Sequence, residues 1–172
     1  MEKLPALEKN FRVHCIGRLQ TNKVKYIIDH VCLTHSVDRL PLAQTIDLEA
    51  RRRGTVMPVL VQVSPVGEPQ KGGIAPEELL PFLRELAELK GLSVRGLMAV
   101  MPHTDDRVLL DSLFGSMRSL FERMRDEAVD GIRMEELSMG MSGDYDRAAR
   151  HGATMVRVGS AIFGPSEYPV PR

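Results

Sequence analysis

The stretch "ELSMGMSGDYDRAARHGATMVRVGSAIFG", residues 136–164, contains the pattern that decides the fold. Two short apolar runs, each followed by a glycine and a serine, flank a segment with the composition of a short helix. Strand, helix and strand in this order form a βαβ unit, whose two strands lie parallel in one sheet. The stretch therefore predicts two parallel strands whose carboxyl ends carry similar polar turns.

The same alternation continues toward the N-terminus. Strands are expected at residues 11–17, 32–37, 56–64, 93–100, 134–141 and 153–159. Helices are expected at residues 21–31, 39–54, 76–91, 105–128 and 144–152. Thr21 is expected to cap the first helix, Pro58 to lie near the start of its strand, and Pro76 to lie in a first helical turn.

Six strands that alternate with helices leave two α/β architectures open, an open doubly wound sheet and most of a (β/α)8 barrel. A complete barrel typically needs about 200 residues or more, so a chain of 172 residues is short for one. No linker, low-complexity segment or close repeat interrupts the sequence. We therefore expect one domain over residues 1–172.

Composition excludes several classes of function. The chain has 23 basic and 23 acidic side chains, which gives no electrostatic basis for binding nucleic acid or an anionic membrane. The basic run at residues 51–53 closes a helix-like segment, where cations offset the helix dipole. The sequence shows neither a signal peptide nor an apolar run long enough to cross a bilayer. Cys15 and Cys32 are expected to be buried free thiols, as in the reducing cytoplasm.

The two serine–glycine turns suggest an anion site. Phosphate sites in barrels often form after the last two strands, at the N-terminus of a short helix. Ser142 follows one strand and could cap the next helix, while Gly159 and Ser160 follow the other. Glycine allows close backbone approach, and hydroxyl and N–H groups donate to phosphate. Plain N-capping by the two serines is the alternative.

Arg157 lies within the last predicted strand. Alternation places Val156 and Val158 on one face and Met155 and Arg157 on the other. In a barrel the valines would meet the outer helices, which leaves Arg157 pointing inward. A buried guanidinium needs an acceptor. Either a carboxylate on another strand or a ligand beside the phosphate site would supply it.

These residues carry a family resemblance. The stretches "HCIGRLQTNKVKYI", "THSVDR", "PVLVQVSPVGEPQKGG", "VRGLMAVMP" and residues 137–164 resemble the YggS/PROSC family of pyridoxal-phosphate-binding proteins, related in fold to the N-terminal barrel of alanine racemase. The resemblance implies a (β/α)8-type barrel with pyridoxal 5′-phosphate at its C-terminal mouth. It also implies that Ser142, Gly159 and Ser160 hold the phosphate and that Arg157 faces the pyridine nitrogen.

The sequence departs from the family at the lysine that forms a Schiff base with the cofactor. In the family that lysine ends the first strand, upstream of the segment matched by "HCIG". Here every lysine lies in a helix-like or loop-like context: Lys3, Lys9, Lys23, Lys25, Lys71 and Lys90. The chain therefore resembles a family member without its first two strand–helix units, so that about six of eight remain. A truncated gene model, a fragment and a real paralogue are all consistent with this, and the open barrel would expose apolar strand edges.

We expect a cytoplasmic protein of cofactor homeostasis, which buffers or delivers pyridoxal phosphate and has no catalytic residue. The alternatives are a pyridoxal-phosphate-dependent amino-acid racemase and a truncated paralogue that does not bind the cofactor. A racemase needs two bases, commonly the lysine and a tyrosine. No histidine or cysteine pair has metal-ligand spacing, so no metal is expected. His14 is either a satisfied core histidine or a contact to the cofactor.

Overall fold

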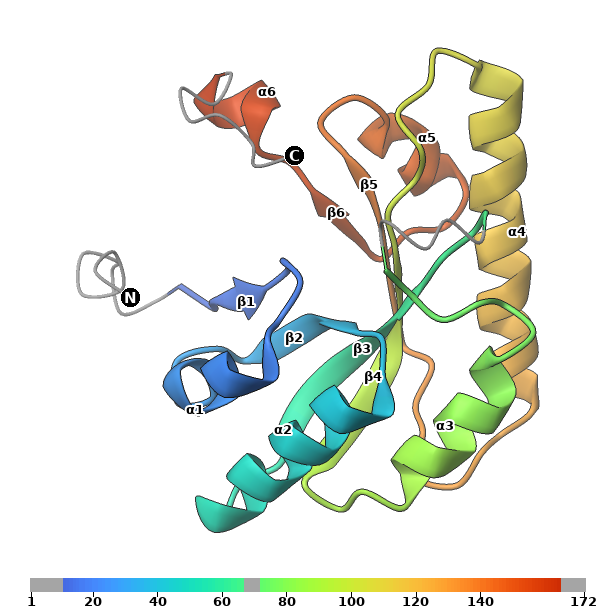
Figure 1. Cartoon of the computed structure of the whole chain (residues 1–172). Coiled ribbons are helices and arrows are strands. Elements are labelled where there is room, and N and C mark those ends of the chain that lie inside the picture. Colours follow the sequence, from blue (N-terminus) through green and yellow to red (C-terminus); the bar gives the residue numbers. More distant parts are fainter. Residues whose placement is uncertain (1–10, 67–71, 165–172) are drawn as a thin grey trace.

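Six parallel strands form one sheet in a computed structural model that describes residues 11–66 and 72–164. The strands are β1 (His14–Cys15), β2 (Leu33–Val37), β3 (Met57–Val63), β4 (Leu92–Ala99), β5 (Glu136–Met141) and β6 (Met155–Arg157). Their spatial order equals their order in the chain, and every neighbouring pair is parallel. A doubly wound sheet would reverse its order at a central strand. The expectation of an incomplete barrel is therefore confirmed, with β1 and β6 as its edges (Figure 1).

Helices cover the outer face of the curled sheet (Figure 1). The helices are η2 (Thr21–Lys23), α1 (Val24–Ile27), α2 (Leu40–Arg52), α3 (Leu79–Ala87), α4 (Arg107–Asp126), α5 (Tyr145–Arg150) and α6 (Ser160–Phe163). The last of them, α6, follows β6 and lies apart from this outer layer. On β3 the side chains of Val59 and Val61 are fully buried in the main core, which also contains the inward faces of α2, α3 and α4. This layer between strands and helices holds most of the buried apolar surface, the main source of folding free energy.

The inner face of the sheet has a smaller apolar cluster of its own. Leu33, Leu60 and Met98 are buried there, with Val100 and Met155 packed against them. Leu60 alternates with Val59 and Val61, as the two-residue period of a strand requires. Met155 belongs to this inner cluster. Val156 lies on the side of the sheet that faces α5: a Cβ built on Gly140 would be 3.6 Å from the Cγ1 of Val156 and would also meet Ala148 of α5. The predicted alternation along β6 is confirmed for these two residues.

Gly96 allows β4 and β5 to approach each other. Its φ of 149° lies in the region that favours glycine, and a Cβ at this position would collide with the carbonyl oxygen of Glu136. Gly96 pairs with Glu136 in the ladder, and a register shift in the β3–β4 pairing falls next to it. The glycine is therefore required for the sheet to continue toward the site.

Most predicted elements are present, and the differences lie at helix starts. The hydroxyl of Thr21 makes no cap, because the first turn is a 3-10 helix that follows Gln20. Pro76 lies in a turn, and α3 begins three residues later at Leu79. Pro58 is the second residue of β3, as predicted.

Other sequence expectations concern charge, thiols and membranes. The basic run ends α2, where Arg53 forms ion pairs with Glu49 and Asp29. Cys15 and Cys32 are both free, as predicted, but they are half-buried and not fully buried. None of the helices in residues 11–66 and 72–164 combines the length and the apolar character that a membrane span needs.

Candidate functional site

A cavity of about 870 Å³ lies at the carboxyl ends of the strands. All four residues that the sequence singled out line it: Ser142, Arg157, Gly159 and Ser160. His14 and His35 line it as well, from β1 and β2. The volume lies in the range of small-molecule sites. The curl of the sheet thus brings the first two strands and the last two around one space.

The two serine–glycine turns are joined by a single oxygen. The Oγ of Ser142 accepts hydrogen bonds from the backbone N–H of Gly159 at 3.0 Å and from that of Ala161 at 3.3 Å. The alternative in which Ser142 caps the following helix was wrong. The N-cap of α5 is Asp144, whose carboxylate accepts from the backbone N–H of Met141 at 2.6 Å. Two N–H donors from the start of α6 therefore converge on one acceptor, and Ala161 is a donor that the sequence did not reveal.

Ser160 is the first residue of α6, and Gly159 is its N-cap. The side chain of Ser160 makes no capping hydrogen bond and is exposed at the mouth of the cavity. Plain capping therefore does not explain either serine, since Ser142 accepts from a neighbouring helix and the hydroxyl of Ser160 caps none.

Arg157 projects from β6 toward the interior and is held by neutral acceptors. Its Nη1 donates to the carbonyl oxygen of Ser138 at 3.0 Å and to the Oγ of Ser138 at 2.8 Å. Its Nη2 donates to the carbonyl oxygen of Ala99 at 2.8 Å. In the part of the chain that the structure describes, Arg157 forms no ion pair. The interpretation as a structural ion pair was therefore wrong, because carbonyl groups on β4 and β5 supply the acceptors.

The charge of Arg157 is only partly compensated. Burial lowers the pKa of its guanidinium, and the more distant charge of Asp144 opposes that effect. The three hydrogen bonds use three of the five N–H groups that a guanidinium carries. Two N–H groups of Arg157 therefore have no partner among the described residues, and the residue lines the cavity.

A pair of histidines continues this network. The Nδ1 of His14 lies 3.0 Å from the Nε2 of His35, and the Nδ1 of His35 lies 3.0 Å from the Oγ of Ser138. Burial, followed by the charges of His14 and Arg157, lowers the pKa of His35 to about 4. Burial and the charge of Arg12 lower the pKa of His14, while Glu136 raises it.

Sequence reasoning treated His14 alone and missed this pair. The pair depends on strand register, which the sequence does not mark: His14 pairs with Leu33 in the parallel ladder, and His35 lies two residues further along the same face. His14 is both satisfied within the protein and exposed to the cavity, so the two alternatives for it are not exclusive. Ser138 is fully buried and connects the histidines to Arg157.

The described lysines lie away from the cavity. Lys23 and Lys25 lie on η2 and α1, as predicted. Lys90 lies beyond the end of α3 and donates to the carbonyl oxygen of Ala87. Lys3, Lys9 and Lys71 lie outside the described residues. Among residues 11–66 and 72–164, no lysine lines the cavity, and no group of three potential ligands could hold a metal ion.

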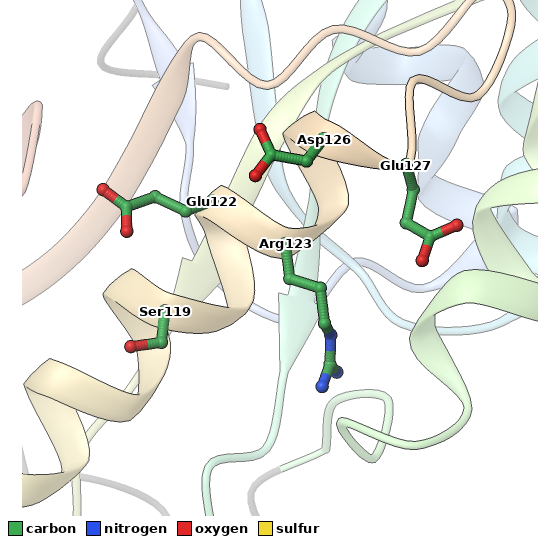
Figure 2. Close-up of a pocket in the computed structure, with 5 residues that line it drawn as sticks. All are labelled: Ser119, Glu122, Arg123, Asp126 and Glu127. Carbon is green, nitrogen blue, oxygen red and sulfur yellow. The ribbon is translucent and has the colours of Figure 1, made fainter.

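A second hollow runs along the exposed face of α4 and has a different character. It is lined by Ser119, Glu122, Arg123, Asp126 and Glu127. Figure 2 shows that the two glutamates, the aspartate and the arginine point in different directions. Charged side chains that diverge from one helix do not define a binding centre, so the cavity at the strand ends is the candidate site.

Comparisons with known proteins agree with this fold. The alanine racemase N-terminal domain family matches residues 2–167. A pyridoxal phosphate homeostasis protein of Aquifex aeolicus is 40% identical over 155 residues, which are 90% of this chain and 67% of the relative. A protein of the same name from Haemophilus influenzae is 34% identical over 171 residues, 98% of this chain and 72% of that one. The chain belongs to the YggS/PROSC family.

Solved structures of related proteins have a fold similar to that of this chain. PipY of Synechococcus elongatus, solved with pyridoxal phosphate bound, is 32% identical and has a TM-score of 0.85, covering 95% of this chain and 74% of PipY. An alanine racemase of Clostridium difficile is 19% identical, with a TM-score of 0.71 over 88% of this chain and 41% of the racemase. That second likeness concerns the fold alone. The chain spans about two thirds of the length of the curated family members that it matches.

Proposed function

We propose that this chain binds pyridoxal 5′-phosphate and takes part in cofactor homeostasis in the cytoplasm, as a buffer or carrier that turns over no substrate. The observation that carries the proposal is the convergence of the N–H groups of Gly159 and Ala161 on the Oγ of Ser142, in the cavity that the partly buried guanidinium of Arg157 also lines. The cavity thus offers both donors for a phosphate and a cation for a flat ring. The PipY structure with bound pyridoxal phosphate supports the choice of ligand.

The residues present fit this cofactor. Ser142, Gly159 and Ser160, together with the N–H of Ala161, would hold the phosphate. Arg157 would face the pyridine nitrogen with its remaining donors. Pyridoxal phosphate, when bound, supplies an aldehyde and an electron-withdrawing ring. No described lysine lines the cavity, so we propose that the cofactor binds reversibly and without a covalent bond to this chain.

Arg157 also bears on the absence of turnover. A guanidinium remains protonated and cannot accept a proton from the ring nitrogen, so it disfavours a pyridinium ring. A neutral ring is a weaker electron sink and supports carbanion chemistry poorly. A racemase would need two bases, and neither of the described tyrosines, Tyr26 and Tyr145, lines the cavity. We therefore propose a binding domain over residues 1–172, with a small-molecule ligand and no nucleic-acid or membrane partner.

The experiment compares pyridoxine 5′-phosphate with pyridoxine by isothermal titration calorimetry. Neither has an aldehyde, so neither forms imines with surface lysines. The phosphate should strengthen binding about a hundredfold or more, since hydrogen bonds to a charged group contribute about 1.5–3 kcal/mol each. Ser160→Ala should reduce this advantage roughly tenfold. Ser116→Ala, which removes an exposed hydroxyl on α4, serves as the matched control.

Two outcomes would count against the proposal. Equal affinity for the two compounds would exclude a phosphate site. Unchanged affinity for the phosphate in Ser160→Ala would remove the serine–glycine turn from the site, even if the ligand bound elsewhere.

A further inference from the structure

The direction of the hydrogen bonds from Arg157 to His14 follows from the structure. Arg157 can only donate, so the Oγ of Ser138 is an acceptor in their bond. Ser138 is fully buried, and its own hydroxyl hydrogen has one other neighbour among the described residues, the Nδ1 of His35. A buried donor without an acceptor costs about 1–3 kcal/mol. The hydroxyl of Ser138 therefore donates to His35.

The same reasoning fixes the two imidazoles. A neutral histidine that accepts at Nδ1 carries its proton on Nε2. His35 therefore donates from Nε2 to the Nδ1 of His14, 3.0 Å away. His14 in turn carries its proton on Nε2, which makes no hydrogen bond within the described part of the chain. Since His14 lines the cavity, the series of hydrogen bonds that begins at Arg157 ends in an N–H donor on a residue of the cavity wall.

The chemistry of the ligand indicates what this donor meets, on the basis of the function proposed above. In pyridoxal phosphate a single ring carbon separates the ring nitrogen from the carbon that bears the phosphate arm. The nitrogen and the phosphate would be held by Arg157 and by the turn that follows it, so this ring edge would lie along β6. The other edge, which carries the 3-oxygen, then faces across the cavity, where β1 and β2 place His14 and His35.

We propose that the Nε2–H of His14 recognises the 3-oxygen of the bound ring and that Arg157 fixes the direction of this donor through Ser138 and His35. Bonds that all point the same way polarise one another, which strengthens the last donor. His14 is then a ligand-recognition residue, while Ser138 and His35 are positioning residues. Arg12 and Glu136 are the other charged groups that act on His14, and their effects oppose each other.

The first test needs no ligand. Long-range proton–nitrogen NMR of ¹⁵N-labelled protein at neutral pH reports which ring nitrogen carries the proton. Both His14 and His35 should be protonated at Nε2 alone. A proton on the Nδ1 of either ring would overturn the proposal, as would an unchanged His35 spectrum in Ser138→Ala. Ser116→Ala should leave both histidines as in the wild type.

The second test measures recognition of the oxygen. The wild type should bind pyridoxine 5′-phosphate roughly tenfold more tightly than its 3-deoxy analogue, as expected for one hydrogen bond to a charged or polar acceptor. His14→Ala should bring this ratio close to one, while the exposed His30→Ala should preserve it. An equal loss of affinity for both compounds in His14→Ala would overturn the assignment. Failure of the wild type to bind either compound would instead refute the proposed function, with the NMR result still deciding the direction of the bonds.

Discussion

Acidification from pH 7 to pH 4 is expected to lower the free energy of unfolding through His35. Burial holds the pKa of this histidine at about 4, against an ordinary value of 6.5. The unfolded chain therefore takes up the proton first, so stability is complete above pH 6.5 and falls as the pH approaches 4. Between the pKa of His35 in the unfolded chain and that in the folded chain, each pH unit changes the free energy of unfolding by about 1.4 kcal/mol. The free energy of unfolding is therefore lower by about 2 kcal/mol at pH 5 and by about 3 kcal/mol at pH 4.

The substitution His35→Asn isolates this effect, because asparagine does not titrate and still offers Ser138 an acceptor. The chain has no tryptophan, so urea unfolding is followed by far-ultraviolet circular dichroism at pH 7, 6 and 5. At pH 7 the variant should be about 1–2 kcal/mol less stable, since the bond to His14 is lost. From pH 7 to pH 5 the free energy of unfolding should fall by about 2 kcal/mol less in His35→Asn than in the wild type. Parallel curves for the two proteins would refute the reasoning, and His30→Asn should reproduce the wild-type curve.

Two further expectations concern the sheet and the cofactor bond. Gly96→Ala should destabilise the protein by about 3 kcal/mol or more, because its Cβ meets the backbone of Glu136 at a positive φ; a smaller change in urea unfolding would mean that β4 and β5 can separate without cost. Treatment with pyridoxal phosphate and borohydride should give no stoichiometric pyridoxyl-lysine by mass spectrometry, because no described lysine lines the cavity. Scattered partial labelling agrees with this, whereas full labelling of a single lysine contradicts it.

The sequence predicted the fold well because the fold depends on periodicity. Apolar runs such as residues 57–63 and amphipathic segments such as residues 107–126 have patterns that only one kind of element buries efficiently. Helix starts were predicted less well. Thr21 and Ser142 are residue types that favour N-caps, but a cap also requires the chain to enter the helix at a suitable angle, and that angle depends on neighbouring turns.

The candidate site could be predicted only in part. Two similar turns after consecutive strands led to four candidate residues, and the structure brings all four to one cavity: Ser142, Arg157, Gly159 and Ser160. Their role in binding stays a prediction. The acceptors of Arg157 and the partner of His14 were not found. The partner of His14 depends on strand register, which no sequence pattern marks. The acceptors of Arg157 include backbone carbonyl groups, which every residue carries.

The hydroxyl of Ser142 sets a condition on any ligand of the serine–glycine turns. The N–H groups of Gly159 and Ala161 already have an acceptor, so a ligand must exchange that acceptor for one of its own. A neutral alcohol or ether gains almost nothing from such an exchange, because one neutral hydrogen bond replaces another. A phosphate gains the difference between a charged and a neutral acceptor, about 1 kcal/mol for each bond. The turn thus favours anionic ligands over neutral ones, and it binds an anion weakly enough for the anion to dissociate.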